Sequence, residues 1–425
     1  MSEAGTAIER DWTELAAMVG RENLRMAGSD EAVDGIQPRG VIAPQDSRQL
    51  ARVMNYCSLA GLTLIVRGGG TKLAVGNRPQ RADFILSTAR LNRIIEYAWD
   101  DMTATVEAGC TIENLQSVLR QHGQMLAADP LQPERATVGG VLATAESGTL
   151  RIRYGGIRDL VLGLEMVLAD GSLVKAGGKV VKNVAGYDLT KLAIGSFGTL
   201  GVITQAVFRL HPVPFAMASY SASLTSAAEA SKLVLAILDS HLIYTGLQLR
   251  AERAGEITID VRFEGIAEVL QDQLLKLGRV AGVDRFSESA GDAWSARSKL
   301  FAGAAESVIS KCNVLPAQIG RLCDAVLRQA ELAGIRAALA AQATGVTEVR
   351  LDAAGLSAGI ATVKALRREV ERLDGTLIVQ RCPAAMKQEL DVWGGMTDAL
   401  PLMRRIKQKF DPGGVLNPGR FLGGI

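Results

Sequence analysis

The sequence VIAPQDSRQLARVMNYCSLAGLTLIVRGGGTK, residues 41–72, decides the fold of the N-terminal half. It predicts a short strand, a helix capped by Asp46 or Ser47, and a second, buried strand that ends in glycines at 68–70. Gly61 suits the end of the helix because glycine adopts the left-handed backbone conformation at little cost. A strand, a helix and a strand with a glycine loop form a βαβ unit, in which ligands bind at the carboxyl ends of strands.

Length and composition indicate a compact globular protein of two or three domains. The chain has 425 residues, of which 48% are hydrophobic and 22% are charged, as in packed rather than disordered proteins. The net charge of +2 provides no strong field to attract nucleic acid or an anionic membrane. The N-terminus lacks the apolar core of a signal peptide, and no apolar run reaches the roughly 18 residues of a membrane span. We therefore expect a cytoplasmic protein that meets the inner face of a membrane only through partners.

The cysteines and histidines exclude several kinds of site. The five cysteines are scattered and include no C-x-x-C pair, which argues against a disulfide framework, a zinc site and an iron–sulfur cluster. Cys57 and Cys323 occupy apolar positions of helical patterns and are expected to be buried. The histidines are His122, His211 and His241, and no two of them have the spacing of metal ligands. We therefore expect no metal site.

Four segments are expected along the chain. They are an N-terminal helical segment at 1–37, an α/β domain at 38–214, an α+β domain at 215–383 and a C-terminal segment at 384–425. The boundary near 214 follows from His211-Pro212-Val213-Pro214, because proline interrupts a strand. After it, the order strand, helix, strand, strand, helix occurs twice, which predicts an antiparallel sheet with helices on one face.

Three glycine-rich segments are the candidate ligand loops. Glycines lack Cβ atoms, so the N–H groups of Arg67-Gly68-Gly69-Gly70-Thr71-Lys72 can converge on a phosphate. The spacing matches neither the P-loop nor G-x-G-x-x-G, and a triple glycine alone is equally an ordinary turn. Thr137-Val138-Gly139-Gly140, shortly after Pro130, suits close backbone approach to a ligand or a tight turn into a helix. The third segment, Gly195-Ser196-Phe197-Gly198-Thr199-Leu200-Gly201-Val202-Ile203-Thr204, leads into a buried strand.

Together these segments resemble the FAD-binding domain of the vanillyl-alcohol oxidase and p-cresol methylhydroxylase (PCMH) type. The resemblance covers roughly residues 38–214 and the tail at 410–421, which contains Asn417-Pro418-Gly419-Arg420. Residues 158–163 and 182–189 narrow it to the E-type FAD-binding subunits of bacterial glycolate oxidase (glycolate dehydrogenase). The resemblance implies an α+β protein: a PCMH-type FAD-binding domain of two subdomains, an antiparallel-sheet cap domain, and a tail that returns to the FAD site.

The resemblance also implies which residues hold FAD. They are Arg67, Gly68, Gly69, Gly70, Thr71, Lys72, Pro130, Thr137, Val138, Gly139, Gly140, Ser147, Gly148, Tyr154, Gly155, Arg158, Asp159, Gly198, Gly201, Val202, Ile203 and Asn417. The first two glycine segments would wrap the pyrophosphate, and Asn417 would reach toward the isoalloxazine. Relatives with covalent flavin carry a histidine or cysteine near the first loop, where this chain has Thr71 and Lys72. Non-covalent FAD is therefore expected.

The resemblance further implies oxidation of a 2-hydroxy acid, glycolate or D-lactate, together with a D-type flavin subunit and an iron–sulfur subunit. Relatives that oxidise these acids themselves carry paired histidines and a metal in the cap domain, whereas residues 215–381 contain only His241. Lys182 and Tyr187 remain candidates for a catalytic base or for a wall of the flavin site. Two alternatives stay open: a self-sufficient FAD-dependent oxidoreductase of another small substrate, and a non-catalytic flavin-carrying assembly subunit.

Overall fold

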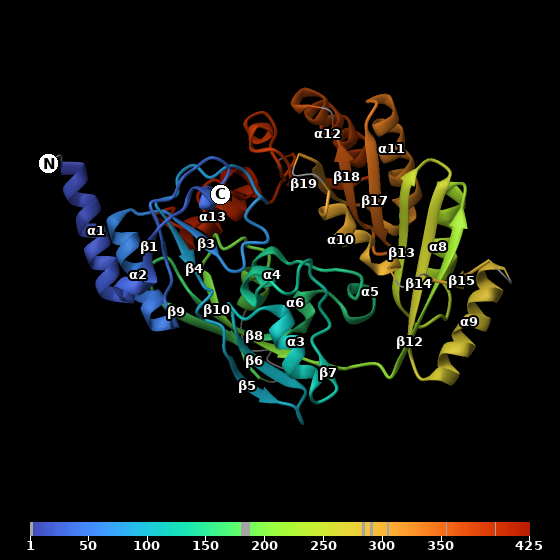
Figure 1. Cartoon of the computed structure of the whole chain (residues 1–425), viewed down its shortest axis with the longest axis horizontal. Coiled ribbons are helices and arrows are strands. Elements are labelled where there is room, and N and C mark those ends of the chain that lie inside the picture. Colours follow the sequence, from blue (N-terminus) through green and yellow to red (C-terminus); the bar gives the residue numbers. More distant parts are fainter. Residues whose placement is uncertain are drawn as a thin grey trace. The chain divides into compact units, whose positions relative to one another are not determined.

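The computed structural model describes residues 3–179, 188–282, 285–289, 292–303, 306–353, 355–395 and 397–425. The chain divides into two compact units (Figure 1). The first comprises Met1–Gly148, Gly155–Val213 and Met396–Ile425, and the second comprises Thr149–Tyr154 and Pro214–Gly395. The C-terminal segment therefore belongs to the same unit as the N-terminal half.

The first unit contains the following helices and strands. They are α1 (Glu3–Val19), β1 (Leu24–Met26), β2 (Gly40–Ile42), α2 (Ser47–Ala60), β3 (Leu64–Arg67), β4 (Phe84–Ser87), β5 (Ile94–Ala98), β6 (Thr103–Glu107), α3 (Ile112–Arg120), β7 (Gln124–Met125), α4 (Val138–Thr144), α6 (Ile157–Leu160), β8 (Val161–Val167), β9 (Leu173–Gly177), α7 (Leu189–Ala193), β10 (Val202–Arg209), β11 (His211–Pro212) and α13 (Leu400–Phe410). One sheet has the order β1-β2-β4-β3, with β2, β4 and β3 parallel. A second, antiparallel sheet has the order β5-β6-β10-β8-β9.

The predicted βαβ unit is confirmed as β2, α2 and β3. The Asp46 carboxylate accepts a hydrogen bond from the N–H of Gln49 at 2.8 Å and so caps α2. Gly61 ends the helix with φ of 65°, in the left-handed region. One face of α2 is buried in the core of the unit, through Leu50, Val53, Met54 and Cys57. The helix therefore holds β3, and the glycine loop after it, in place.

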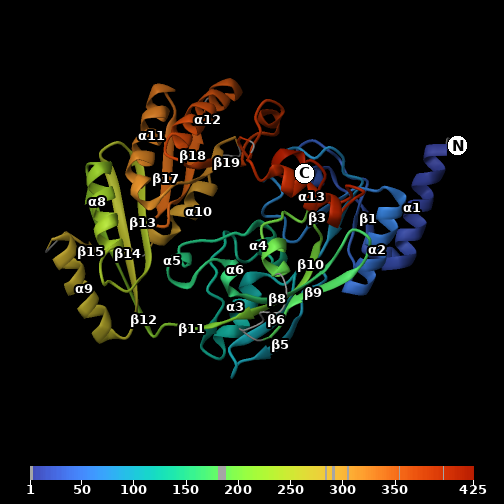
Figure 2. The ribbon, with the colours of Figure 1, turned by 180° about the vertical axis from the view of Figure 1, so that it is seen from behind.

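The C-terminal tail runs alongside β3, and Figures 1 and 2 both show α13 next to this strand. The N–H of Leu64 donates to the carbonyl of Val415 at 2.8 Å, and the N–H of Asn417 donates to the carbonyl of Leu64 at 2.9 Å. Leu64 and Leu416 form a parallel bridge. Val415 and Leu416 are buried in the same core as α2. The tail is therefore part of the core of the first unit.

A buried ion pair fixes the start of the tail. Asp411 is 1% exposed and accepts hydrogen bonds from the N–H groups of Val415 and Leu416 at 2.9 and 2.8 Å. The Lys407 ammonium donates to Asp411 at 2.5 Å and to the carbonyls of Thr199 and Leu416 at 2.9 Å each. Burial lowers the pKa of Lys407, and the Asp411 carboxylate opposes that shift. The pair thus joins α13, the tail and the segment before β10.

The second unit is built on one eight-stranded antiparallel sheet. Its elements are α5 (Arg151–Tyr154), β12 (Ala216–Leu224), α8 (Ala227–Leu238), β13 (Tyr244–Arg253), β14 (Glu256–Gly265), α9 (Ala267–Ala281), β15 (Ser287–Glu288), α10 (Ala296–Phe301), β16 (Val308–Asn313), α11 (Ile319–Leu332), β17 (Arg336–Gln342), β18 (Val346–Asp352), α12 (Leu356–Glu371) and β19 (Thr376–Arg381). The strand order is β15-β12-β14-β13-β17-β18-β16-β19. The predicted antiparallel sheet is therefore confirmed.

The expectation that all helices lie on one face of this sheet is wrong for α10. Helices α8, α9, α11 and α12 share the main core on one face, whereas α10 packs on the opposite face (Figure 1). Leu300 of α10 lies on Ala338 and Ala340 of β17. These alanines are short enough to leave room for a helix, and a helix of six residues is too short to stand out in the sequence.

Two further expectations concern cysteines and membrane spans. All five cysteines are buried and free of disulfides, as expected for Cys57 and Cys323. Burial raises the pKa of both thiols to about 12. Across the described ranges, no helix has the length and apolar character that a membrane crossing requires.

Replacing Asp411 should destabilise the first unit strongly. We expect Asp411→Ala to lower the free energy of unfolding by about 3–5 kcal/mol, because it leaves Lys407 buried without its carboxylate. Glu113→Ala is the control, since it breaks an exposed pair with Arg120 and should cost less than about 1 kcal/mol. Urea unfolding of the two variants measures the difference. Equal costs would contradict the role given to Asp411.

Candidate functional site

The first glycine loop lies directly against the second glycine segment. A Cβ atom at Gly68 would lie 2.1 Å from the Thr137 hydroxyl oxygen, and one at Gly69 would lie 1.7 Å from the carbonyl oxygen of Arg135. Both distances are far below a van der Waals contact, so only glycine allows this approach. Gly70 has φ of 76°, a conformation that favours glycine. Segments about 70 residues apart in sequence are thus brought together, as the resemblance implies.

The two glycines of the second segment have different roles. The Thr137 hydroxyl caps α4 by accepting a hydrogen bond from the N–H of Gly140 at 3.3 Å. A Cβ at Gly139 would lie 2.8 Å from that of Ala108, so Gly139 serves the packing of α4. Gly140 instead lines a cavity together with the first loop. The cavity is therefore formed by Gly140 and Thr137 on one side and by the 68–72 loop on the other.

This cavity, which we call the loop cavity, has a volume of ≈ 70 Å³. Its lining residues are Val66, Arg67, Gly68, Gly69, Gly70, Thr71, Lys72, Leu73, Thr137, Gly140, Ala143, Thr144, Phe197 and Arg420. Pockets for whole ligands usually enclose several hundred Å³. The loop cavity is therefore suited to one portion of a cofactor, and its glycine backbone is suited to a phosphate group.

Two of the cations at the loop cavity are paired with carboxylates. The Arg67 guanidinium lies 2.7 Å from Glu31, and the Lys72 ammonium lies 3.0 Å from Glu146. Hydrogen bonds from Arg25 and then from Arg67 lower the pKa of Glu31 to about 2, against the effect of burial. Both carboxylates therefore neutralise cations that line the cavity.

Arg420, which belongs to the C-terminal tail, holds the backbone next to the first glycine loop. Its guanidinium is 4% exposed and donates to the carbonyls of Leu73 and Val75 at 2.8 Å each. Burial lowers the pKa of Arg420 to about 10. The tail thus holds the backbone that follows the glycine loop.

Asn417 was expected to reach toward the isoalloxazine. Its amide nitrogen donates to the carbonyls of Phe197 and Gly198 at 2.8 and 3.2 Å, and its oxygen accepts from the N–H of Val66 at 3.3 Å. These partners are backbone groups of β3 and of the loop before β10. In this structure Asn417 therefore joins two walls of the site.

Several other expected cofactor residues lie near the loop cavity without lining it. Pro130 and Val138 are buried, and so are Val202 and Ile203 at the start of β10. Gly201 packs closely on Met166, and Gly148 packs closely on Asp129. The Ser147 hydroxyl is buried and has no hydrogen-bond partner among the described residues. A buried polar atom of this kind is a usual sign of a missing ligand or water.

The remaining expected residues are placed elsewhere or not described. Tyr154 belongs to the second unit, where its hydroxyl donates to Glu264 at 3.0 Å, and burial raises its pKa to about 12. Gly155 has φ of 84° and adjoins Asp159, whose carboxylate accepts the N–H of Gly156. Arg158 is exposed. Lys182 and Tyr187, the candidates for a catalytic base, lie outside the described residues.

The sequence reasoning missed Glu146, Phe197 and Arg420. Arg420 stood inside the quoted tail motif, so its spacing from Asn417 was a usable signal. Phe197 lines the loop cavity and stacks on Phe421, with ring centroids 5.5 Å apart. Phe197 likewise stood inside the third glycine-rich segment, so its position in that segment was a usable signal. For Glu146 the sequence contains no local signal, because its partner Lys72 is distant along the chain.

The second unit contains a buried polar set on the face that carries α10. The Arg297 guanidinium of α10 pairs with Glu348 of β18 at 3.0 Å, and Glu348 is 1% exposed. Lys311 of β16 stands directly opposite Glu348 in the sheet register. Gln342 is 5% exposed, and neither of its amide atoms has a hydrogen-bond partner among the described residues. Glu348 therefore neutralises the charge of Arg297.

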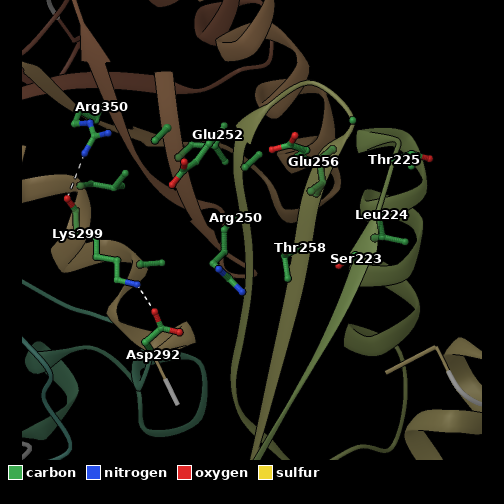
Figure 3. Close-up of a pocket in the computed structure, with 17 residues that line it drawn as sticks. Ser223, Leu224, Thr225, Arg250, Glu252, Glu256, Thr258, Asp292, Lys299 and Arg350 are labelled. Atoms are coloured by element: carbon green, nitrogen blue, oxygen red, sulfur yellow. Dashed lines mark hydrogen bonds and ion pairs between the residues drawn. The ribbon is translucent and has the colours of Figure 1, made fainter. Parts of the chain in front are cut away.

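A larger cavity lies in the second unit. It has a volume of ≈ 440 Å³ and lies between the sheet and α10 (Figure 3). Each of its cationic side chains is held by a carboxylate: Arg250 by Asp260, Lys299 by Asp292 and Arg350 by Asp352. Glu252 and Glu256 add negative charge to the lining. The balance of charge therefore disfavours an anionic acid in this cavity.

Within the described ranges, no group of three or more His, Cys, Asp or Glu side chains is placed to hold a metal ion. His241, the one histidine between 215 and 381, is exposed.

Residues 38–177 match the model of an FAD binding domain family. The chain is 37% identical to the glycolate oxidase subunit GlcD of Bacillus subtilis over 42% of its own length and 38% of that protein. It is 29% identical to a D-lactate dehydrogenase of Archaeoglobus fulgidus over 92% of its length and 94% of that protein. A Mycobacterium tuberculosis FAD-linked oxidoreductase is 27% identical over 91% of both chains.

Solved structures share the fold. The structure of p-cresol methylhydroxylase with bound substrate superposes with a TM-score of 0.79 at 17% identity, covering 99% of this chain and 97% of the other. Alkyldihydroxyacetonephosphate synthase gives 0.74 at 18% identity, covering 97% and 86%. At these identities the likeness establishes the fold, and it confirms the expected PCMH-type architecture.

Substituting Gly69 should weaken cofactor binding. We expect Gly69→Ala to lower the affinity of the apoprotein for FAD at least tenfold, since the added methyl group meets the backbone of Arg135. Gly413→Ala is the control, because a Cβ there meets only Val415 at 3.5 Å. Titration of apoprotein with FAD, with circular dichroism to check folding, measures both variants. Full affinity in a folded Gly69→Ala variant would show that the loop does not hold the cofactor.

The residues of the first unit fit FAD. The glycine backbone of the 68–70 loop and Gly140 line the loop cavity, where it suits a phosphate group, and the buried Ser147 hydroxyl has no hydrogen-bond partner among the described residues. The chain thus contains an FAD-binding domain at residues 38–177, has FAD as its cofactor, and is similar to FAD-linked oxidoreductases over about nine tenths of its length.

Proposed function

We propose that this FAD-dependent oxidoreductase is the FAD-binding subunit of a complex that oxidises glycolate or D-lactate to the 2-oxo acid. The observation that carries the proposal is its similarity to proteins named for these two 2-hydroxy acids. The partners would be a D-type flavin subunit and an iron–sulfur subunit, and a complex of this kind would place the chain in the cytoplasm or at the inner face of a membrane.

Oxidation of a 2-hydroxy acid removes a hydride from carbon and a proton from the hydroxyl group. When bound, FAD accepts the electron pair. The loops at 67–72 and 137–140 would hold the cofactor, and the tail holds the backbone on both sides of the first loop, through Asn417 at Val66 and Arg420 at Leu73 and Val75. The remaining requirement is a group that takes the hydroxyl proton.

The residues of the second unit support the proposal that oxidation of the acid depends on partner subunits. Its described residues offer no metal-ligand group, and its histidine, His241, is exposed. Arg297, a cation that would attract a substrate carboxylate, is already neutralised by Glu348. Among the described residues of the second unit, these groups therefore provide no evident means of polarising the hydroxyl and binding the acid.

The path of the electrons also supports a partner. The five cysteines are all buried and scattered along the sequence, so they do not form the ligand set of an iron–sulfur cluster. Electrons from the flavin would leave to a partner subunit or to a diffusible acceptor.

A self-sufficient enzyme is the second candidate. It is favoured by the alignment with 94% of a relative named D-lactate dehydrogenase, which is named as an enzyme and not as a subunit. Reduction of the isolated chain by substrate separates the two candidates.

The cofactor should be non-covalent, because the lining of the loop cavity includes neither histidine nor cysteine. Purified protein should be yellow and should release its flavin into the supernatant on acid precipitation. Absorbance of the supernatant and of the pellet measures the partition. Flavin retained in the pellet would show a covalent bond.

The isolated chain should reduce its flavin with glycolate or D-lactate very slowly. General acid–base catalysis contributes about 10² to 10⁴-fold to such reactions, and no described group of the second unit provides it. Anaerobic stopped-flow of the isolated chain, followed by the same measurement with both partner subunits, tests this expectation. Rapid bleaching of the chain alone would establish the self-sufficient enzyme.

A further inference from the structure

Glu146 stands close to the loop cavity and neutralises one of its cations. Its carboxylate lies 3.0 Å from the Lys72 ammonium, and the side chains of Lys72 and Glu146 are 14% and 4% exposed. Lys72 lines the cavity together with the three glycines of the loop. The pair is therefore shielded from solvent and adjoins the place where a phosphate fits.

The backbone holds Glu146 firmly in this position. It follows Ala145, which ends α4 with φ of 47°, and its N–H donates to the carbonyl of Val141 at 3.0 Å. The carboxylate also accepts the N–H of Leu131 at 2.9 Å. Glu146 therefore cannot move far from the cavity when a ligand arrives.

Carboxylates compensate two of the three cations that line the loop cavity, which are Arg67, Lys72 and Arg420. Arg67 is paired with Glu31. Arg420 keeps its charge, but its guanidinium donates to the backbone carbonyls of Leu73 and Val75. An incoming pyrophosphate must share Lys72 with Glu146, and the two anions repel one another at short range.

We propose that Glu146 is a built-in competitor of the FAD pyrophosphate for Lys72. In the apoprotein it compensates a buried ammonium and so stabilises the empty loop. In the holoprotein the same negative charge weakens cofactor binding. Glu146 thus lowers the affinity for FAD and raises the stability of the apoprotein. Lys72 is the side chain for which the Glu146 carboxylate and the pyrophosphate compete.

Glu146→Gln removes the negative charge and keeps the side chain in place, because the amide oxygen can still accept the hydrogen bond from the N–H of Leu131. We expect this variant to bind ADP and FAD about tenfold more tightly, by a similar factor for both, since ADP carries the same pyrophosphate. Its apoprotein should melt at a lower temperature than the wild type. Lys72→Met should weaken both ligands about tenfold, because it removes a charged phosphate ligand.

The experiment is calorimetric titration of the apoprotein with ADP and with FAD, together with thermal unfolding of each apoprotein. Glu165→Gln is the matched control, because Glu165 is also buried and lysine-paired, through Lys175, but does not line the cavity. It should leave both affinities unchanged.

Three results would overturn the proposal. Unchanged or weaker ADP binding by Glu146→Gln would show that its charge does not oppose the pyrophosphate. A gain for FAD without a gain for ADP would place the carboxylate near another part of the cofactor. Unchanged ADP binding by Lys72→Met would remove Lys72 from the phosphate site.

Discussion

The parallel pairing of the C-terminal tail with β3 is the contact on which the first unit depends. It completes the core around Leu64 and Leu416, and the buried Lys407–Asp411 pair holds it in register. Asn417 and Arg420 extend the same contact to both sides of the glycine loop. Because the loop itself consists largely of glycine, its shape is set by these surrounding contacts rather than by its own side chains.

Local signals in the sequence were sufficient for the βαβ unit of the first unit and for the antiparallel sheet of the second. Asp46 and Gly61 mark the ends of α2, and the two strand-helix-strand-strand-helix runs predict the antiparallel sheet. The features that the sequence did not predict depend on contacts between residues far apart in the chain. Helix α10 lies on the opposite face only because Ala338 and Ala340 of another strand leave space for it, and no pattern within α10 itself contains that information.

The residues of the candidate site also fall into those that the sequence predicts and those that only distant contacts reveal. The glycine segments were found because glycine leaves a chemical signature, and the structure brings Gly68 and Gly69 against the 135–137 backbone. Glu146 left no such signature, since its partner Lys72 lies 74 residues away and a single glutamate is commonplace. Asn417 was recognised from a motif, yet its contacts with Val66 and Phe197 are visible only in three dimensions.

The discontinuity of the first unit has a consequence for the order of folding. Its core includes Val415 and Leu416, which are separated from β3 along the chain by the residues of the second unit at 214–395. Contacts between segments so far apart in sequence form slowly, because the chain between them must first close into a loop. The backbone on both sides of the glycine loop is therefore fixed only once the tail has docked on β3, and firm capture of the flavin has to follow that step.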